Sequence, residues 1–232
     1  MQHSLEETPQ LLHDWFTGWA ALRTYPTSFD TGYPAALRRD RGGTWEHFIG
    51  DPSPLSLATL AAQVRTVPGS TLSVWGHDVQ RYVDQAHLAG LKLVSTGEML
   101  MSLDLDLMDA EDPYLADPDF TLSTARLGGR HDSSAVVARY ATAIRSGQAM
   151  VAWGMVAVHS DVAVFDQTQT VPAFRRRGFG RLVMDALAAR ALDHPVRQGL
   201  LLASPSGQQL YEKLGWRRVC PITVLAVPAP RQ

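Results

Sequence analysis

Three strand-like segments follow one another in the middle of the chain, and apolar and polar residues alternate in the last of them, before Pro172. The segments are residues 135–144, 149–158 and 162–170, and short polar breaks at residues 145–148 and 159–161 separate them. Such alternation is typical of a strand that buries one face. Breaks of this length join antiparallel strands. The pattern therefore predicts a three-stranded antiparallel meander.

A helical pattern follows the last of these strands. Leu182, Val183 and Leu187 recur at the spacing of one helix face, and Pro195 ends the run. Residues 200–203 are continuously apolar and predict a buried strand. A strand, a helix and a strand in this order form a crossover that makes the two strands parallel. We therefore expect a mixed, largely antiparallel sheet flanked by helices, in the α/β (α+β) class.

The first half of the chain repeats part of this order. Residues 71–75 predict a strand, residues 77–88 a helix and residues 99–105 a further strand, just as residues 199–219 predict a strand, a short helix and a strand. The similarity indicates either an internal duplication or chance, and the sequence alone favours neither. Because of this repeated order, we treat residues 1–105 as a separate lobe.

Acidic residues gather between the two halves. They are Asp104, Asp106, Asp109, Glu111, Asp112, Asp117 and Asp119. Pro113 and Pro118 interrupt regular structure there, so the segment is typical of a solvated linker, although acids near a cleft would also attract a cationic amine. We therefore expect a lobe at residues 1–105, an acidic linker at residues 106–119 and a second domain at residues 120–232.

Composition excludes several classes of function. The chain of 232 residues has a formal net charge of −2, whereas partners such as nucleic acid or a membrane surface require a net basic face. Cys220 is the only cysteine, and the histidines show no paired spacing with carboxylates, so we expect no internal disulfide and no metal site. The N-terminal residues lack the features of a signal peptide, and no apolar stretch is long enough to span a bilayer, so a cytoplasmic protein is expected.

Chemically informative residues concentrate where the third strand meets the helix. Residues 170–181 read TVPAFRRRGFGR, so Gly178 and Gly180 fall at the helix N-terminus. Free backbone N–H groups and the positive end of the helix dipole favour phosphate there, and glycine allows a phosphate to approach. Four arginines add positive charge: Arg175, Arg176, Arg177 and Arg181. A phosphate-binding loop is one interpretation, and a solvated arginine cluster is the other.

A second motif favours the phosphate-binding loop. Residues 210–216 read LYEKLGW and follow a predicted strand. The ordered pair of this segment and the R-x-x-G-x-G of residues 175–180 resembles the GNAT superfamily of acyl-CoA-dependent N-acyltransferases. The resemblance covers residues 120–232 well, and it implies a GNAT catalytic domain with two splayed parallel strands and acetyl-CoA as the acyl donor. Residues 1–105 then resemble a second, degenerate GNAT-like lobe.

The resemblance implies a set of cofactor-binding residues along the strand, the loop and the helix start. They are Thr168, Gln169, Thr170, Arg175, Arg176, Arg177, Gly178, Phe179, Gly180, Arg181 and Ser204. The backbone N–H groups of residues 168–170 would hold the pantetheine arm and stabilise an oxyanion. Many relatives carry asparagine at the position of Ser204, so that contact differs here. In the first lobe, residues 38–43 contain an acid within their arginine-glycine segment and precede no apolar helix, so one cofactor site is expected.

Two catalytic residues are predicted. Tyr211 occupies the family's position for protonating the leaving thiolate, and the usual phenol pKa of about 10 keeps it protonated at neutral pH; a packing role is the alternative. Many relatives carry a glutamate on the strand before the second motif, but residues 199–202 offer no carboxylate. We favour Asp166 as the general base, because strand alternation places it on the same face as Thr168 and Thr170. Its alternatives are a solvent-facing acid and a water relay.

The sequence therefore predicts an N-acetyltransferase that transfers an acetyl group from acetyl-CoA to a primary amine of a small molecule or peptide. A non-catalytic acyl-CoA-binding or sensing module is the alternative. Whether the protein forms a homodimer stays open. The tryptophans of the first lobe either wall the cleft or fill a core, and they are Trp15, Trp19, Trp45 and Trp75.

Overall fold

The computed structural model describes residues 8–108, 111–128 and 135–228. The first lobe consists of α1 (Thr8–Arg23), β1 (Thr27–Ser28), β2 (Ala35–Arg38), the short 3-10 helix η1 (Arg39–Arg41), β3 (Thr44–Gly50), α2 (Pro54–Val64), β4 (Thr71–Trp75), α3 (Val79–Leu88) and β5 (Lys92–Asp104). The remaining elements are η2 (Leu105–Leu107), β6 (Thr121–Arg126), β7 (Val136–Ser146), β8 (Ala149–His159), β9 (Val162–Thr170), η3 (Pro172–Phe174), α4 (Phe179–Leu192), β10 (Gln198–Ala203), α5 (Pro205–Lys213) and β11 (Arg217–Ala226).

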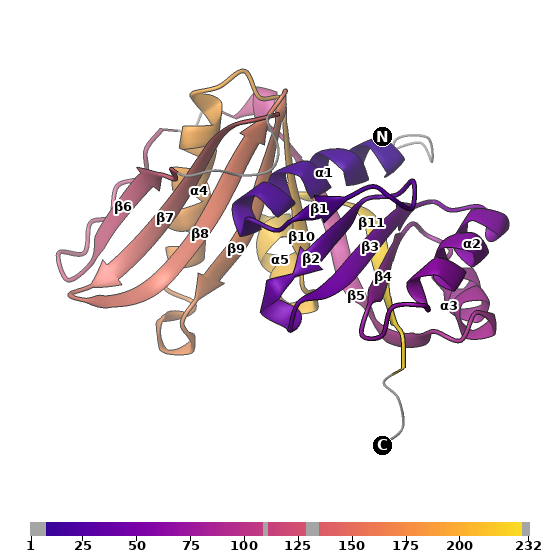
Figure 1. Ribbon diagram of the computed structural model, residues 1–232. Helices are drawn as coiled ribbons and strands as arrows, with labels where there is room; N and C mark the ends of the chain where they lie inside the picture. Colours follow the sequence, from indigo (N-terminus) through magenta and orange to yellow (C-terminus); the bar gives the residue numbers. More distant parts are fainter. Residues whose placement is uncertain (1–7, 109–110, 129–134, 229–232) are drawn as a thin grey trace.

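The described strands all join one sheet, in the order β1-β2-β3-β4-β11-β5-β10-β9-β8-β7-β6 (Figure 1). Within the described ranges, β3–β4 and β9–β10 are the parallel pairs and the other neighbours are antiparallel, so the predicted mixed sheet is confirmed. β7, β8 and β9 form the predicted meander, and β9, α4 and β10 form the predicted crossover. β6 extends the sheet beyond β7, and the sequence patterns did not predict it.

The last strands of the two halves exchange places. β5 of the first lobe pairs with β10, β11 pairs with β4, and the two exchanged strands pair with each other. The order β4-α3-β5 matches the order β10-α5-β11, as the sequence patterns predicted. The structure adds a second parallel crossover, β3-α2-β4. It was not predicted because a helix was sought directly after residues 38–43, where the chain instead forms the strand Thr44–Gly50 before α2 begins at Pro54. The two halves therefore share one sheet.

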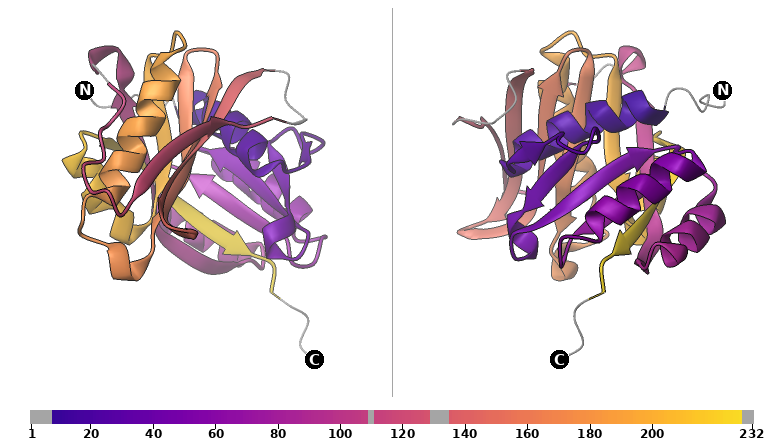
Figure 2. Two further views of the ribbon diagram at one scale, coloured as in Figure 1. Left: turned by 90° about the vertical axis from the view of Figure 1, so that its left-hand side faces the viewer. Right: turned by 45° about the vertical axis from the view of Figure 1, so that its right-hand side comes forward.

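Helix α1 covers one face of the sheet, and α4 and α5 cover the other (Figure 2). On β9, Val164 packs in the core beneath α1, while Phe165 packs in the core beneath α4. Gly18 allows α1 to approach β9 closely, because a Cβ there would lie 2.6 Å from Val164 Cγ2. α1 thus joins the first lobe to strands of the second half. None of the described helices is long and apolar enough to cross a membrane.

Three of the described acids between the halves pair with arginines. The ion pairs are Asp104–Arg217 at 2.7 Å, Asp112–Arg190 at 2.7 Å and Asp117–Arg177 at 3.3 Å. Asp109 lies outside the described residues. Exposed pairs of this kind contribute about 0–1 kcal/mol each, so they orient the segment more than they stabilise the fold. Asp112 and Asp117 therefore hold the segment against the second half, while most residues of 111–119 are exposed to solvent.

Candidate active site

The two central parallel strands separate partway along their length. β9 and β10 pair from Val162 to Phe165, but β9 continues without β10 as far as Thr170. A β-bulge causes the separation: the pairing of β8 with β9 shifts register here, and Gln167 has a φ of 56°. The predicted splay is therefore present, and it leaves the edge of β9 after Phe165 without a partner on β10.

A cavity of about 1110 Å³ extends through this splay. One end is lined by residues of β9, the following loop, α4 and α5, and the other end by residues of α1, β2, β3, β4 and β5. Sites for one small ligand usually measure about 300–1,000 Å³. The cavity thus exceeds the usual volume of a site for one small ligand, and residues from both faces of the sheet line it.

Most of the predicted cofactor-binding residues line this cavity. They are Thr168, Gln169, Thr170, Arg175, Arg176, Gly178, Phe179, Gly180, Arg181 and Ser204. The hydroxyl of Ser204 also accepts a hydrogen bond from the Gly207 N–H at 3.3 Å and so caps the start of α5. The structure therefore brings the loop, the strand edge and the start of α5 together, as expected from the order of the motifs.

The loop before α4 has the backbone geometry of an anion site. Arg176 and Gly178 have φ values of 66° and 83°, in the left-handed region. Such a conformation costs a non-glycine residue about 1–3 kcal/mol and is characteristic of functional sites. α4 begins at Phe179 without a side-chain cap, so its first N–H groups can bind a phosphate. A Cβ on Gly178 would meet no atom within 4 Å, so the space beside the loop is open.

Arg177 does not line the cavity. Its guanidinium lies over the rings of Phe120, Phe179 and Phe174, at 4.7, 5.2 and 5.9 Å from their centroids. It also donates a hydrogen bond to Asp117 at 3.3 Å. The predicted contact between this side chain and the cofactor is therefore not supported. Arg177 instead fastens the acidic segment to the loop.

Replacing Arg177 with glutamine tests this assignment. We expect the affinity for acetyl-CoA to change by less than about twofold, and the free energy of unfolding to fall by about 0.5–1 kcal/mol because a partly exposed cation–π contact is lost. Isothermal calorimetry and thermal unfolding measure the two effects. Arg176→Gln is the matched control, because Arg176 lines the cavity and its loss should weaken binding. A larger binding defect in Arg177→Gln than in Arg176→Gln would contradict the assignment.

Tyr211 lies on α5, with 8% of its surface exposed, and lines the cavity. Burial raises the pKa of its phenol above the usual value, while a hydrogen bond with Thr168 lowers it in part. The ring packs against the edge of Trp216, with the centroids 6.1 Å apart. Its ring is therefore part of the core, and its phenol keeps its proton at neutral pH. Packing and proton donation are compatible in this geometry.

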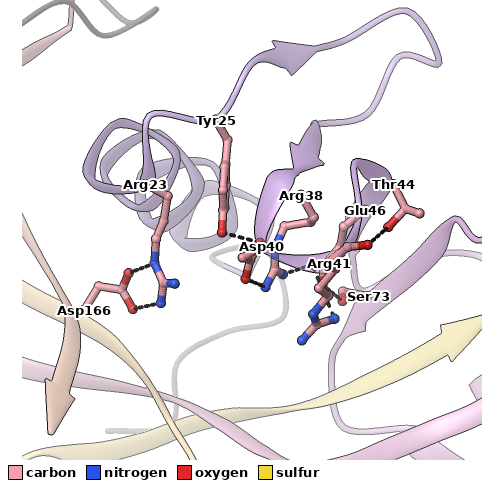
Figure 3. A network of polar contacts seen from close by, with 9 residues as sticks. All are labelled: Arg23, Tyr25, Arg38, Asp40, Arg41, Thr44, Glu46, Ser73 and Asp166. Atoms are coloured by element: carbon pink, nitrogen blue, oxygen red, sulfur yellow. Dashed lines mark hydrogen bonds and ion pairs between the residues drawn. The ribbon is translucent and has the colours of Figure 1, made fainter.

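Asp166 forms an ion pair that the sequence did not reveal. Its two carboxylate oxygens accept hydrogen bonds from Arg23 of α1, from Nε at 2.5 Å and from Nη2 at 3.0 Å (Figure 3). Thr168 points to the other face, because its hydroxyl donates to Met184 Sδ on α4. The prediction that Asp166 and Thr168 share a face is wrong, since the bulge at Gln167 breaks the alternation. The ion pair also does not favour the base role predicted for Asp166.

Arg38, Asp40, Glu46 and Ser73 line the other end of the cavity and belong to one polar network, which Figure 3 shows. Tyr25 donates to Asp40 at 2.5 Å, and Arg38 donates to Asp40 at 2.9 Å and to Glu46. The Ser73 hydroxyl donates to Glu46 at 2.6 Å. The Arg38 guanidinium holds the pKa of Asp40 well below its usual range. The arginine-rich residues 38–43, which sequence analysis considered only as a second phosphate loop, therefore contribute to this end of the cavity.

The corresponding crossover of the first lobe is closed. β3 and β4 remain paired to their ends, from Glu46 to Gly50, and the Asp51 N–H donates to the Trp75 carbonyl at 2.7 Å. Tyr82 of α3 donates to Asp51 at 3.3 Å, and burial raises its pKa to about 12. No splay opens between these two described strands, so an acyl-CoA arm has no slot there.

Residues 134–225 match the family model described as an acetyltransferase (GNAT) domain. No curated protein matches the chain. Among solved structures, a GCN5-related N-acetyltransferase from Kribbella flavida is 13% identical, with a TM-score of 0.63 over 99% of this chain and 97% of that one. A tandem GNAT protein from the clavulanic acid biosynthesis pathway is 14% identical, with a TM-score of 0.61 over 83% and 77%. A GNAT-family protein from Novosphingobium aromaticivorans is 15% identical, with a TM-score of 0.56 over 96% and 98%.

At such low identities, the likeness to solved structures shows the fold alone. The match to a tandem GNAT protein agrees with the repeated order of elements in the two halves. The family match is independent of it, and the matched residues 134–225 contain the splayed strands, the loop before α4 and Tyr211. The C-terminal half of this chain is therefore a GNAT acetyltransferase domain, within a fold that GNAT proteins share over most of the chain.

Proposed function

We propose that the protein is an acyl-CoA-dependent N-acetyltransferase, which transfers an acetyl group from acetyl-CoA to a primary amine of a small molecule or peptide. The observation that carries the proposal is a single cavity that contains the open start of α4, the unpaired edge of β9 and Tyr211. A phosphate site, hydrogen-bond donors for an oxyanion and a proton donor are the groups that acyl transfer from a thioester requires.

The donor would bind in the end of the cavity next to α4. The first N–H groups of α4, together with Arg175, Arg176 and Arg181, would hold its diphosphate. The edge of β9 at residues 167–170 has no partner on β10, so its backbone can pair with the pantetheine arm as with an added strand. Acetyl-CoA bound in this way supplies a thioester carbonyl to the reaction.

The residues around this position would then provide the acid and the oxyanion site. Backbone N–H groups at residues 168–170 would donate to the carbonyl oxygen as negative charge develops on it. The phenol of Tyr211 would donate its proton to the leaving sulfur, because burial keeps it protonated. These groups leave one task, which is removal of a proton from the attacking amine.

Release of free thiol from acetyl-CoA tests the proposal. The amines phenethylamine, spermidine and glycinamide cover aromatic, polycationic and peptide-like acceptors. We expect thiol release by the intact protein to depend on at least one of them and to saturate with its concentration. Tight binding of acetyl-CoA by calorimetry without thiol release from a broad amine panel would instead identify a non-catalytic acyl-CoA-binding module.

A further inference from the structure

Four carboxylates line the cavity, and one of them has no partner. Asp166 pairs with Arg23, and Asp40 and Glu46 both pair with Arg38. Glu98 forms no hydrogen bond or ion pair with any residue in the described ranges, although it lines the same cavity. This half-buried carboxylate is therefore available to a ligand.

The exchanged strand β5 positions Glu98. Next to it, the Gly97 carbonyl accepts a hydrogen bond from Gln208 of α5 at 2.8 Å. A Cβ on Gly97 would lie 2.8 Å from Pro205 Cγ, so position 97 faces α5. Alternation along β5 then turns Glu98 to the opposite face, where Leu100 packs in the core beneath α1. Glu98 thus faces the end of the cavity opposite to the phosphate loop.

Many GNAT relatives carry a glutamate on the strand that corresponds to β10, and here β5 lies directly beside that strand. Residues 199–202 of β10 carry no acid, but β10 pairs with β5 over Gln198–Ala203. Met99, the residue after Glu98, is opposite Ala203, where β10 ends beside the splay. The first lobe therefore delivers a carboxylate to the edge at which the second half has none.

The surroundings of Glu98 suit an organic cation. Trp15, Trp19, Phe48 and Trp75 line this end of the cavity, and aromatic faces attract cations. The Arg38 guanidinium already lies over the Trp19 ring, 5.2 Å from its centroid, so the other rings are the ones available to a ligand. The same four side chains belong to a buried core cluster. Trp15, Trp19 and Trp75 therefore both line the cavity and fill the core. An aromatic floor with one unpaired acid favours an ammonium group carried on an apolar body.

The charged groups around Glu98 adjust its protonation. Burial raises the pKa of Glu98, the nearby carboxylate of Glu46 raises it further, and Arg41 and Arg38 lower it in part. The Arg23–Asp166 pair lines the wall formed by α1 and β9. A carboxylate with a raised pKa is a better proton acceptor near neutral pH than an ordinary one.

We propose that Glu98 is the acceptor-binding carboxylate and general base of this site, and that the acceptor is a primary ammonium compound with an apolar or aromatic body, entering from the α1 face. This inference rests on the proposed N-acetyltransferase function. Under this proposal the first lobe supplies the general base through Glu98 of β5, and the GNAT domain of the C-terminal half supplies the other reacting groups.

The proton balance of the proposed step is complete. The ammonium gives one proton to Glu98, and the resulting amine forms a C–N bond to the carbonyl carbon as the C–S bond breaks. Tyr211 gives its proton to the leaving sulfur, and the second nitrogen proton returns to the Tyr211 phenolate. Glu98 then releases its proton to solvent, so each turnover yields one amide, one thiol and one proton.

Glu98→Gln, which keeps the shape and removes the charge, is the first test. We expect kcat/KM for the amine to fall about a hundredfold or more, and the acidic limb of the pH–rate profile to disappear. Affinity for acetyl-CoA should stay unchanged. Asp104→Asn is the matched control, because Asp104 lies on the same strand, pairs with Arg217 and does not line the cavity. A retained acidic limb in Glu98→Gln, or its loss in Asp166→Asn instead, would overturn the proposal.

A second measurement does not depend on turnover. In protein labelled with carboxyl-¹³C glutamate, the resonance absent from Glu98→Gln should titrate above the ordinary glutamate pKa of about 4.3 and shift when phenethylamine is added. A titration midpoint at the ordinary glutamate pKa, together with no shift of the resonance on addition of phenethylamine, spermidine or glycinamide, would overturn the assignment. If no amine releases thiol but this resonance responds to amine, the proposed activity fails while the ammonium site stands.

Discussion

Replacing Gly180 with glutamate is expected to lower the affinity for acetyl-CoA tenfold or more, a loss of about 1.4 kcal/mol or greater. Gly180 is in the first turn of α4 and lines the cavity. A carboxylate there would repel the diphosphate from the N–H groups that we propose bind it. The fold should survive, because a Cβ at this position would make only ordinary contacts, at 3.4 Å from Leu210 and 3.6 Å from Thr170. Isothermal calorimetry with acetyl-CoA measures the change.

Gly180→Ala is the matched control, since it adds the Cβ without the charge. Gly178→Glu should also abolish tight binding, but Gly178 has a φ of 83°, so any side chain there strains the loop as well. Comparing the acetyl-CoA affinities of the Gly180→Ala and Gly180→Glu variants separates the effect of the negative charge from the effect of adding a side chain. If a folded Gly180→Glu protein binds acetyl-CoA with wild-type affinity, the assignment of residues 175–180 as a phosphate-binding loop is wrong.

The residues that line the end of the cavity next to α4 were predictable because their signals are local in sequence. Anion binding at a helix start depends on consecutive residues, so the arginines, the glycines and the helical pattern after them were sufficient. Arg177 is the exception. Its partner Asp117 precedes it by 60 residues, and only the fold shows that this guanidinium is occupied there.

The bulge in β9 and the exchange of β5 and β11 have no local signal in the sequence of the kind that marks the loop before α4. Gln167 takes a left-handed conformation although it is neither glycine nor asparagine, so nothing in the sequence indicated that alternation fails between Asp166 and Thr168. Alternation shows which face of a strand is buried, but not which strand lies beside it. The pairing of β5 with β10, and with it the position of Glu98, therefore could not be predicted.

Replacing Tyr211 with phenylalanine is expected to lower kcat about ten- to a thousandfold, with little change in the affinity for acetyl-CoA. The variant keeps the ring and its contact with Trp216, and it removes the proton that the phenol can give. A coenzyme A thiolate is already a tolerable leaving group, so a partial loss is expected. Single-turnover thiol release, with an amine that the intact protein accepts, measures the chemical step.

The first lobe supplies a matched control for this change. Tyr82→Phe also removes a buried tyrosine hydroxyl, here one bonded to Asp51, from the corresponding helix α3, and Tyr82 does not line the cavity. Its effect should appear in the free energy of unfolding, by about 0.5–1.5 kcal/mol, and not in kcat. A loss of kcat in Tyr211→Phe alone therefore reports proton donation. If Tyr211→Phe turns over at the wild-type rate while chemistry limits, Tyr211 is a packing residue and the thiolate leaves without an acid.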